Sequence, residues 1–395
     1  MGNRSTKKSV DDEVKEALER KDEALAAAKI QVYLEEEKNV PLNIAITGET
    51  GSGKSTFVNA IRGVGDDDEE AAPTGVVETT MEATPYLHPN FTNVKLWDLP
   101  GVGTMNFTAA KYLKEVGLEK FDFFIIVSAD RFRENDVKLA KEIQKMKKEF
   151  YFVCSKIDVD IENEKRKREF NEEKTLKQIR DNCTQGLQDQ GFESPQVFLV
   201  SSRELHLYDF PLLVETLERE LPDHKKNAFL LAMPNTSLEM IDRKKKAFKS
   251  KIKYLATLSA AVAGVPVPGL SVAVDLSLLV SVVTQYVFGF NLDIPSLKRL
   301  SNYTGVPYEE LKEVIMSPLA ATIITPDLLL RILVQTAGMA LLMAVEEGSR
   351  FIPILGIPFS MVLSFTFTYK ALNLVLDMLA EDAKRVLHKS CGVNG

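Results

Sequence analysis

Cysteine is scarce in this chain. The three cysteines, Cys154, Cys183 and Cys391, are an odd number and lack the spacing of metal ligands. A disulfide framework is therefore excluded, and a reducing, cytoplasmic compartment is the simplest interpretation.

An excess of positive charge is also absent. The 49 Lys and Arg residues are outnumbered by 56 Asp and Glu, which gives a net charge of -7 and a pI near 5.5. Basic clusters at 165–168 and 243–246 lie in charge-mixed, helix-like stretches, which is typical of solvated helix faces. Because nucleic-acid binding needs a basic stripe, nucleic acid is excluded as the main partner.

Long uninterrupted apolar runs are missing as well. Two uncharged runs, at 254–274 and 351–369, approach the length of a membrane span. Proline interrupts both, as at Pro266 in the first run and Pro353 in the second. Buried helical hairpins explain these runs better than bilayer spans do.

What is present is an alternation of short apolar runs with helical patterns across 40–222. The runs lie at 41–47, 94–98, 121–128, 150–155 and 196–201. This alternation predicts an α/β fold with a doubly wound, mostly parallel sheet, which binds ligands at the carboxyl ends of its strands. The strand pattern stops beyond residue 222, so we expect a helical domain over 223–395. An amphipathic helix expected over 10–38 assigns 1–39 to the same domain.

The most specific motif lies between the first run and a helical pattern. Eight residues fit a phosphate loop, and Thr56 follows them in the helix: Gly48, Glu49, Thr50, Gly51, Ser52, Gly53, Lys54 and Ser55. The glycines permit a tight turn whose N–H groups, together with the helix N-terminus, face phosphate oxygens. Lys54 supplies charge for the β- and γ-phosphates, and Ser55 supplies a hydroxyl for Mg²⁺.

A second motif, Asp98-Leu-Pro-Gly101, ends the run at 94–98. Its carboxylate lies where it holds magnesium through water, and the Gly101 N–H lies where it reaches the γ-phosphate. GTPases also place a threonine between the phosphate loop and this motif, where it binds Mg²⁺ and senses the γ-phosphate. Thr80 is our choice, and Thr74 and Thr79 are close competitors. The expected metal ligands are therefore Ser55, Thr80 and Asp98.

A third motif, Ser155-Lys-Ile-Asp158, selects the base. The Asp158 carboxylate accepts hydrogen bonds from both N1–H and the exocyclic amine of guanine, while the stem of Lys156 lies across the ring. Adenine has no such pair of donors, so GTP and GDP are the expected ligands. Backbone groups of Ser201 and Ser202, after the last run, are expected at the guanine O6.

One catalytic group is absent. Ras-type enzymes use a glutamine just after the Asp-x-x-Gly glycine to orient the attacking water, but Val102 occupies that place here. Either hydrolysis is slow, or another group supplies the positioning when two molecules meet. We expect weak basal turnover that rises with protein concentration.

Taken together, the motifs resemble those of the immunity-related GTPases, also called interferon-inducible GTPases. The segments that carry the resemblance are 48–55, 74–81, 97–101, 151–153 and 208–211. Lysine at position 54 resembles the effector-type branch rather than relatives with methionine there.

The resemblance implies a Ras-like GTP-binding domain joined to a helical domain made from both chain ends. It also implies a homodimer through the GTP-binding domains, GTP-dependent oligomers, contacts with other family GTPases and defence at vacuoles of intracellular pathogens. The family's switch glutamate, which contacts the partner's nucleotide, corresponds to Glu78. The expected catalytic group is then Lys54, Thr80, Gly101 and Glu78.

The segment Met1-Gly2-Asn-Arg-Ser-Thr6 fits the pattern for N-myristoylation of Gly2. One acyl chain binds membranes only marginally, so GTP-driven oligomers would add avidity. We therefore expect peripheral association with intracellular membranes. A slow-turnover, GTP-gated scaffold is the second hypothesis. A GTPase-headed integral membrane protein that uses both uncharged runs as spans is the third.

Overall fold

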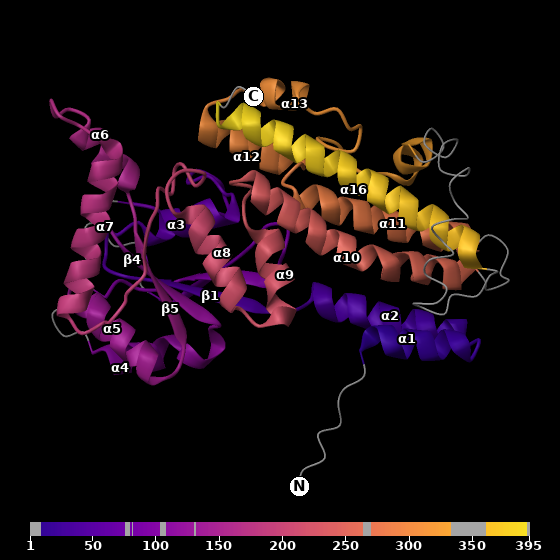
Figure 1. Cartoon of the computed structure of the whole chain (residues 1–395), viewed down its shortest axis with the longest axis horizontal. Coiled ribbons are helices and arrows are strands. Elements are labelled where there is room, and N and C mark those ends of the chain that lie inside the picture. The colour runs from indigo at the N-terminus through magenta and orange to yellow at the C-terminus, as the bar shows by residue number, and fades with distance from the viewer. Residues whose placement is uncertain are drawn as a thin grey trace, which may run out of the picture. The chain divides into compact units, whose positions relative to one another are not determined.

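The computed structural model describes residues 9–75, 80, 82–102, 108–129, 132–263, 270–332 and 361–392 (Figure 1). The chain divides into two compact units. A helical unit comprises Met1–Asn39, Ile241–Leu297 and Glu309–Val386, and a sheet unit comprises Val40–Met240, Lys298–Tyr308 and Leu387–Gly395.

Among the described residues, the sheet unit contains six strands in the order β2-β3-β1-β4-β5-β6. Their bounds are β1 Leu42–Thr47, β2 Thr84–Leu87, β3 Val94–Asp98, β4 Phe123–Ser128, β5 Glu149–Cys154 and β6 Val197–Leu199. All neighbouring pairs are parallel except β2 with β3. The predicted α/β fold with a mostly parallel sheet is confirmed. Strand β2 had not been predicted, because its four residues include Pro85 and alternate in burial at an edge of the sheet.

Helices cover both faces of this sheet (Figure 1). One face packs on helices α4 Ala109–Val116, α5 Glu134–Lys145, α6 Ile157–Glu164 and α7 Glu172–Asp189. The other face packs on α3 Lys54–Arg62, α8 Phe210–Glu220 and α9 Asp223–Ala232. Phe123 of β4 lies edge-on to Phe229 of α9, with ring centroids 6.2 Å apart. The central strands are thus buried on both faces, as their continuous apolar runs require.

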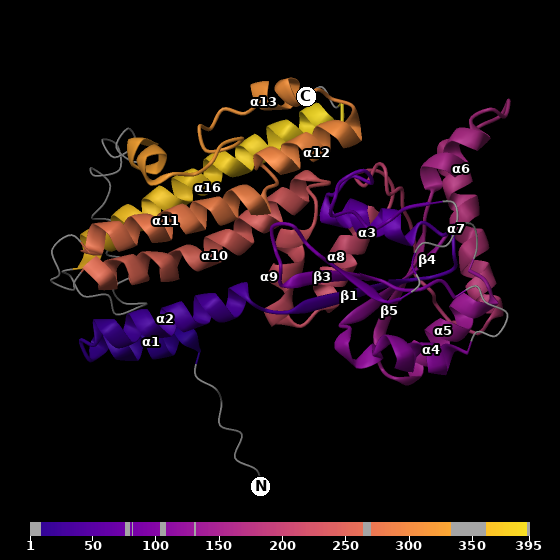
Figure 2. The ribbon, with the colours of Figure 1, turned by 180° about the vertical axis from the view of Figure 1, so that it is seen from behind.

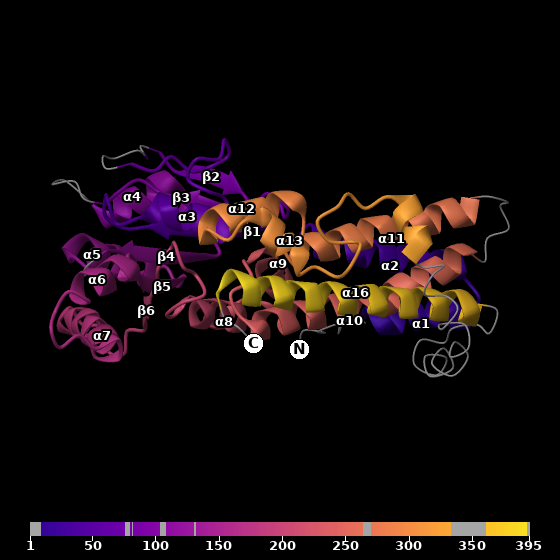
Figure 3. The ribbon, with the colours of Figure 1, turned by 90° about the horizontal axis from the view of Figure 1, so that it is seen from above.

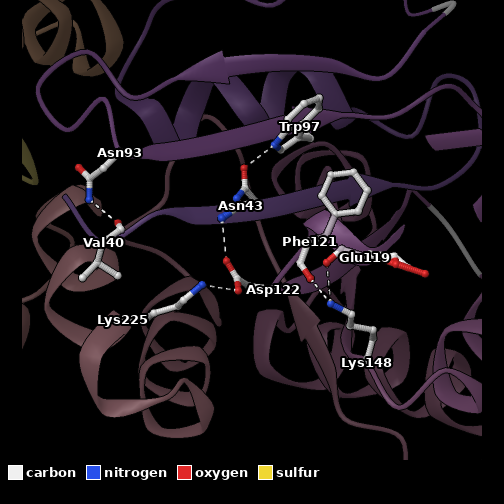
Figure 4. A network of polar contacts seen from close by, with 9 residues as sticks. All are labelled: Val40, Asn43, Asn93, Trp97, Glu119, Phe121, Asp122, Lys148 and Lys225. Atoms are coloured by element: carbon white, nitrogen blue, oxygen red, sulfur yellow. Dashed lines mark hydrogen bonds and ion pairs between the residues drawn. The ribbon is translucent and has the colours of Figure 1, made fainter. Parts of the chain in front are cut away.

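The start of β1 is fixed by a network of polar contacts (Figure 4). The Asp122 carboxylate accepts from the backbone N–H of Asn43 at 2.9 Å and from Lys225 Nζ at 2.6 Å. The side-chain oxygen of Asn43 in turn accepts from Trp97 Nε1 at 3.0 Å. These contacts tie α9 and β3 to the strand whose other end opens into the phosphate loop.

In the helical unit, α10, α11 and α16 run side by side (Figures 1 and 2), and Figure 3 shows the same three helices from above. Its described helices include α1 Val10–Glu19, α2 Glu23–Lys38, α10 Leu238–Ala263, α11 Leu270–Gly289, α12 Ile294–Thr304, α13 Tyr308–Glu313 and α16 Val362–Ser390, of which α10, α12, α13 and α16 extend past the unit's bounds. A cluster of buried side chains joins both chain ends, with Val14, Leu18 and Ile30 packed among Tyr254 and Phe365.

The segment expected as one helix over 10–38 forms two. Lys21 has a φ of 58°, which ends the first helix, and Asp22 Oδ1 accepts from the Leu25 N–H at 2.9 Å, which starts the second. The expected domain bounds stay a prediction. At the expected boundary, α9 and residues 233–240 belong to the sheet unit, because α9 packs on the sheet.

The first uncharged run, 254–274, covers the end of α10 and the beginning of α11, and part of it lies outside the described residues. Of the second run, 351–369, residues 351–360 lie outside the described residues too. Within the described part of the chain, the segment Leu276–Thr304 is long and apolar enough to cross a bilayer, and half of its most apolar window is buried. Core helices of soluble proteins pass the same test of length and composition.

Candidate functional site

The turn after β1 has the backbone shape that the phosphate-loop motif predicts. Gly48, Gly51 and Gly53 have φ values of 138°, 81° and 88°. A Cβ atom at Gly48 would lie 2.0 Å from the Val127 carbonyl oxygen, so no larger residue fits there. Gly53 precedes α3 directly, and the loop therefore opens at a helix N-terminus, where backbone N–H groups and the helix dipole favour an anion.

Two side chains that follow β5 hold this loop. Ser155, after β5, donates to the Ser52 carbonyl at 2.6 Å, and Lys156 Nζ donates to the Gly51 carbonyl at 2.8 Å. Lys54 is buried, and its Nζ donates to the Glu49 carbonyl at 2.9 Å. No role had been predicted for Ser155, although it begins the third motif. Its position after β5 is the signal that identifies it as a link between the base and phosphate segments.

Asp98, Ser55 and Thr80 come together in the structure. Asp98 Oδ2 accepts from Ser55 Oγ at 2.6 Å and from Thr80 Oγ1 at 2.8 Å. Asp98 is fully buried, and no described residue pairs with its Oδ1. Burial raises the pKa of this carboxyl, while the two hydroxyl bonds and the Lys54 charge act in the opposite direction. A buried carboxylate with one unpaired oxygen, flanked by two hydroxyls, is a set of hard oxygen donors that fits Mg²⁺.

A cavity of about 130 Å³ lies over this group. Its lining comes from the phosphate loop, from the segment before β2, from the second motif and from Lys156: Thr50, Gly51, Gly53, Lys54, Ser55, Thr56, Thr74, Gly75, Thr80, Gly101 and Lys156. Thr74 and Thr80 both line the cavity, but the contact of Thr80 with Asp98 distinguishes it. Thr79, the third candidate, lies outside the described residues.

The expected base-binding residues lie at neighbouring strand ends. Asp158 is half-buried in the first turn of α6, and this helix begins directly after Lys156, whose φ is 60°. Ser201 is buried, and its Oγ accepts from the backbone N–H groups of Arg203 and Glu204 at 3.2 and 3.1 Å. This serine shapes the loop through its own hydroxyl. Asp158, Ser201 and Ser202 do not line the cavity described above.

Val102 points into the core rather than into the cavity. Its side chain is fully buried among α4 and α5 residues. The Val102 N–H donates to the Gly48 carbonyl at 3.3 Å, and its carbonyl accepts from Asn135 Nδ2 at 2.7 Å. Asn135 had not been predicted, because no local pattern marks a residue that contacts a loop 33 positions earlier.

An ion pair also joins the phosphate loop to α5. Arg133 Nη1 lies 2.8 Å from Glu49 Oε2, and the Arg133 N–H donates to Asp136 Oδ2 at 3.1 Å. Asp136 is fully buried, and its Oδ1 has no partner among the described residues. Burial, followed by the charge of Glu49, raises the pKa of Asp136 to about 7 against the opposing effects of the Arg133 N–H and of Lys54 and Arg133.

Two predicted residues lie outside the described part of the chain, and their roles stay predictions. They are Glu78, the switch glutamate, and Gly2, the expected lipidation site.

The fold and the site together define a class. A phosphate loop at the carboxyl end of β1, with the second and third motifs at the ends of β3 and β5, is the arrangement of a P-loop nucleotide-binding protein. The sequence pattern of the interferon-inducible GTPase (IIGP) family matches residues 7–390. The chain belongs to this family, as the resemblance of its motifs predicted. It is a GTPase, a hydrolase that acts on GTP.

Named relatives agree with this assignment. The chain is 40% identical over 376 residues to "Interferon-inducible GTPase 5" of Rattus norvegicus, covering 95% of this chain and 81% of that one. It is 39% identical over 391 residues to "Interferon-gamma-inducible GTPase 10" of Mus musculus, covering 98% and 91%. "Interferon-inducible GTPase 1" of Mus musculus is 41% identical over 298 residues, which cover 74% and 72%.

Proposed function

We propose that this GTPase hydrolyses GTP efficiently only as a dimer, in which each protomer completes the other's site. The observation that carries the proposal is Val102. Its side chain is buried in the core and its backbone is bonded on both sides, so it cannot orient a water molecule over the cavity. The switch glutamate Glu78 of a partner subunit would supply this function.

Ser55, Thr80 and Asp98 would hold Mg²⁺ directly or through water. The unpaired Asp98 Oδ1 and the two converging hydroxyls support this assignment. When bound, the ion neutralises charge on the β- and γ-phosphates. Lys54 and the Gly101 N–H would bind those phosphates, and Asp158 would accept the two guanine donors with Lys156, Ser201 and Ser202 around the base.

The test is GTP hydrolysis measured against protein concentration, with ATP in parallel. We expect the specific activity to rise with concentration, and only with GTP, because dimers form by mass action. Specific activity that stays flat contradicts the dimer proposal. Flat and very slow turnover with intact GTP binding would instead favour the slow GTP-gated scaffold.

A mixing experiment makes the test sharper. A Glu78→Ala protomer keeps its own phosphate site but cannot complete its partner's, whereas a Lys54→Ala protomer supplies Glu78 without binding GTP well. Each variant alone should be nearly inactive, and the mixture should recover activity. A mixture no more active than its parts contradicts completion of the site across two protomers.

The cellular setting we propose is cell-autonomous innate defence. Relatives are named for interferon induction, and others are named immunity-related GTPases. GTP-dependent oligomers would assemble on intracellular membranes, including pathogen vacuoles, as peripheral proteins anchored through Gly2. Other GTPases of the family are the proposed additional partners.

A further inference from the structure

Tyr112 lies on the first turn of α4, behind the second motif. Its hydroxyl donates to the Pro100 carbonyl oxygen at 2.9 Å and lies 3.1 Å from Thr47 Oγ1. A phenol has one hydrogen, which here goes to Pro100, so the Thr47 hydroxyl donates to the Tyr112 oxygen. One side chain therefore connects the residue before the phosphate loop with the residue before Gly101.

The hydroxyl of Tyr112 is a permanent donor. Burial raises its pKa far above the ordinary value for tyrosine, against the opposing effect of the Thr47 hydrogen bond. The phenol therefore stays protonated throughout the physiological range. Leu113 and Val116 bury the same helix in the core, which fixes the position of the hydroxyl.

The bond to Pro100 also sets the direction of the next N–H. The Pro100 carbonyl and the Gly101 N–H belong to one planar trans peptide, in which the two groups point in opposite directions. Because the carbonyl points at Tyr112, the Gly101 N–H points away from α4. Gly101 lines the cavity and Tyr112 does not, so the side of the peptide away from Tyr112 is the side on which the γ-phosphate is expected.

This peptide lies between two anchored points. The Leu99 N–H donates to the Ile46 carbonyl at 3.0 Å, and the Val102 N–H donates to the Gly48 carbonyl at 3.3 Å. The peptide between them can rotate about its flanking bonds, and glycine at 101 permits both orientations. The Tyr112 hydroxyl stabilises one of the two.

We propose that Tyr112 is a positioning residue for recognition of the γ-phosphate, because its hydroxyl holds the Pro100–Gly101 peptide with the Gly101 N–H directed into the phosphate cavity. Tyr112 acts through this peptide and contacts neither nucleotide nor metal. The inference rests on the proposed role of Gly101. It makes Tyr112 important for GTP and unimportant for GDP, which has no γ-phosphate.

The experiment compares the affinities of a non-hydrolysable GTP analogue and of GDP in the full chain with Mg²⁺. Tyr112→Phe removes only the hydroxyl. We expect the analogue to bind about five-fold more weakly, which is the size of one lost hydrogen bond, and GDP to bind as before. The matched control is Tyr151→Phe, which removes a hydroxyl bonded to Glu220 in the same unit. It should leave the ratio of the two affinities unchanged.

Equal weakening of both nucleotides would show that Tyr112 is merely structural, and no change in either would show that the hydroxyl is not needed. Both results overturn the inference. If Tyr112→Phe does not fold, Thr47→Val replaces it, because without the Thr47 hydroxyl the Tyr112 hydroxyl loses one of the two contacts that orient it toward Pro100. It should shift the affinity ratio in the same direction. If the unaltered chain does not bind GDP, the proposed nucleotide site itself is wrong. This result differs from the two above, so a failure of the site can be told apart from a failure of the inference about Tyr112.

Discussion

At the residue scale, two buried carboxyl groups have different surroundings. One belongs to the proposed metal site, and the charge of the other destabilises the fold. Asp98 and Asp136 both have a raised pKa and one carboxylate oxygen without a partner among the described residues. The Asp98 carboxylate lies among hydroxyls suited to a cation. Asp136 instead accepts from a backbone group, the Arg133 N–H, which compensates its charge less well.

Asp136 predicts a pH dependence of stability. Its pKa is about 7 in the folded chain, whereas the ordinary value for an aspartate, which applies to the unfolded chain, is 3.8. Between these values the folded state keeps a proton that the unfolded state releases, so stability falls as the pH rises through this window and then levels off. Asp136→Asn keeps an acceptor for the Arg133 N–H but cannot ionise. Its melting temperature should exceed that of the unaltered chain by roughly 3 °C at pH 8, and the difference should shrink toward pH 5.

The measurement is thermal unfolding across that pH range. Exposed Asp67 supplies the control, and Asp67→Asn should follow the unaltered chain at each pH. A gain from Asp136→Asn that is the same at pH 5 and pH 8 would rule out ionisation of Asp136 as its cause.

Asp158 predicts the choice of base. An asparagine offers one donor and one acceptor, which no longer match the two donors of guanine but do match xanthine, whose C2 carries an oxygen. Asp158→Asn should weaken GTP binding about 10- to 100-fold and strengthen XTP binding, as measured by competition with labelled GDP. Asp160→Asn on the same helix should change neither, and unaltered GTP affinity in Asp158→Asn would refute the assignment of the base site.

At the scale of elements, the chain shows which features a sequence specifies locally. The phosphate loop, the second motif and the third motif were predictable because each combines residue type with a position at a strand end. Strand β2 was not, since a four-residue edge strand with a proline depends on pairing with β3. Tyr112 and Asn135 donate hydrogen bonds to residues 12 and 33 positions earlier in the chain, and no local pattern marks such contacts.

Helix α9 gives a prediction at the same scale. Lys225 and Asp122 are both largely buried, at 16% and 21% side-chain exposure, and Asp122 also holds the start of β1. Lys225→Met leaves that carboxylate poorly compensated, so the free energy of unfolding in guanidinium should fall by about 1–3 kcal/mol. Asp122→Asn in the same chain should recover part of the loss.

The neighbouring residue Lys226 is a matched control. It pairs with Asp223, whose side chain is 97% exposed. Lys226→Met should therefore leave the free energy of unfolding nearly unchanged, because water screens so exposed a pair. Equal losses for the two lysine variants would contradict the view that α9 is anchored through Asp122.

At the scale of the whole molecule, residence on membranes is predicted to depend on Gly2. Gly2→Ala prevents myristoylation and should move the protein from the membrane pellet to the soluble fraction of cells. Asn3→Ala keeps the acylation pattern and should behave as the unaltered chain does. Protein that resists carbonate extraction with alanine at position 2 would favour the integral membrane alternative.

The cluster that joins α1 and α2 to α10 and α16 has a consequence for synthesis. Ile30 and Phe365 belong to one core, yet the ribosome makes them 335 residues apart. At ~5–20 residues per second, roughly 20–70 s separate their appearance. Throughout that interval the first helices to emerge lack their last partner. The nascent chain therefore carries helices whose buried positions, Val14, Leu18 and Ile30, still lack part of their core, a surface that a chaperone can bind. The earliest part of this protein to be made is among the last to be buried.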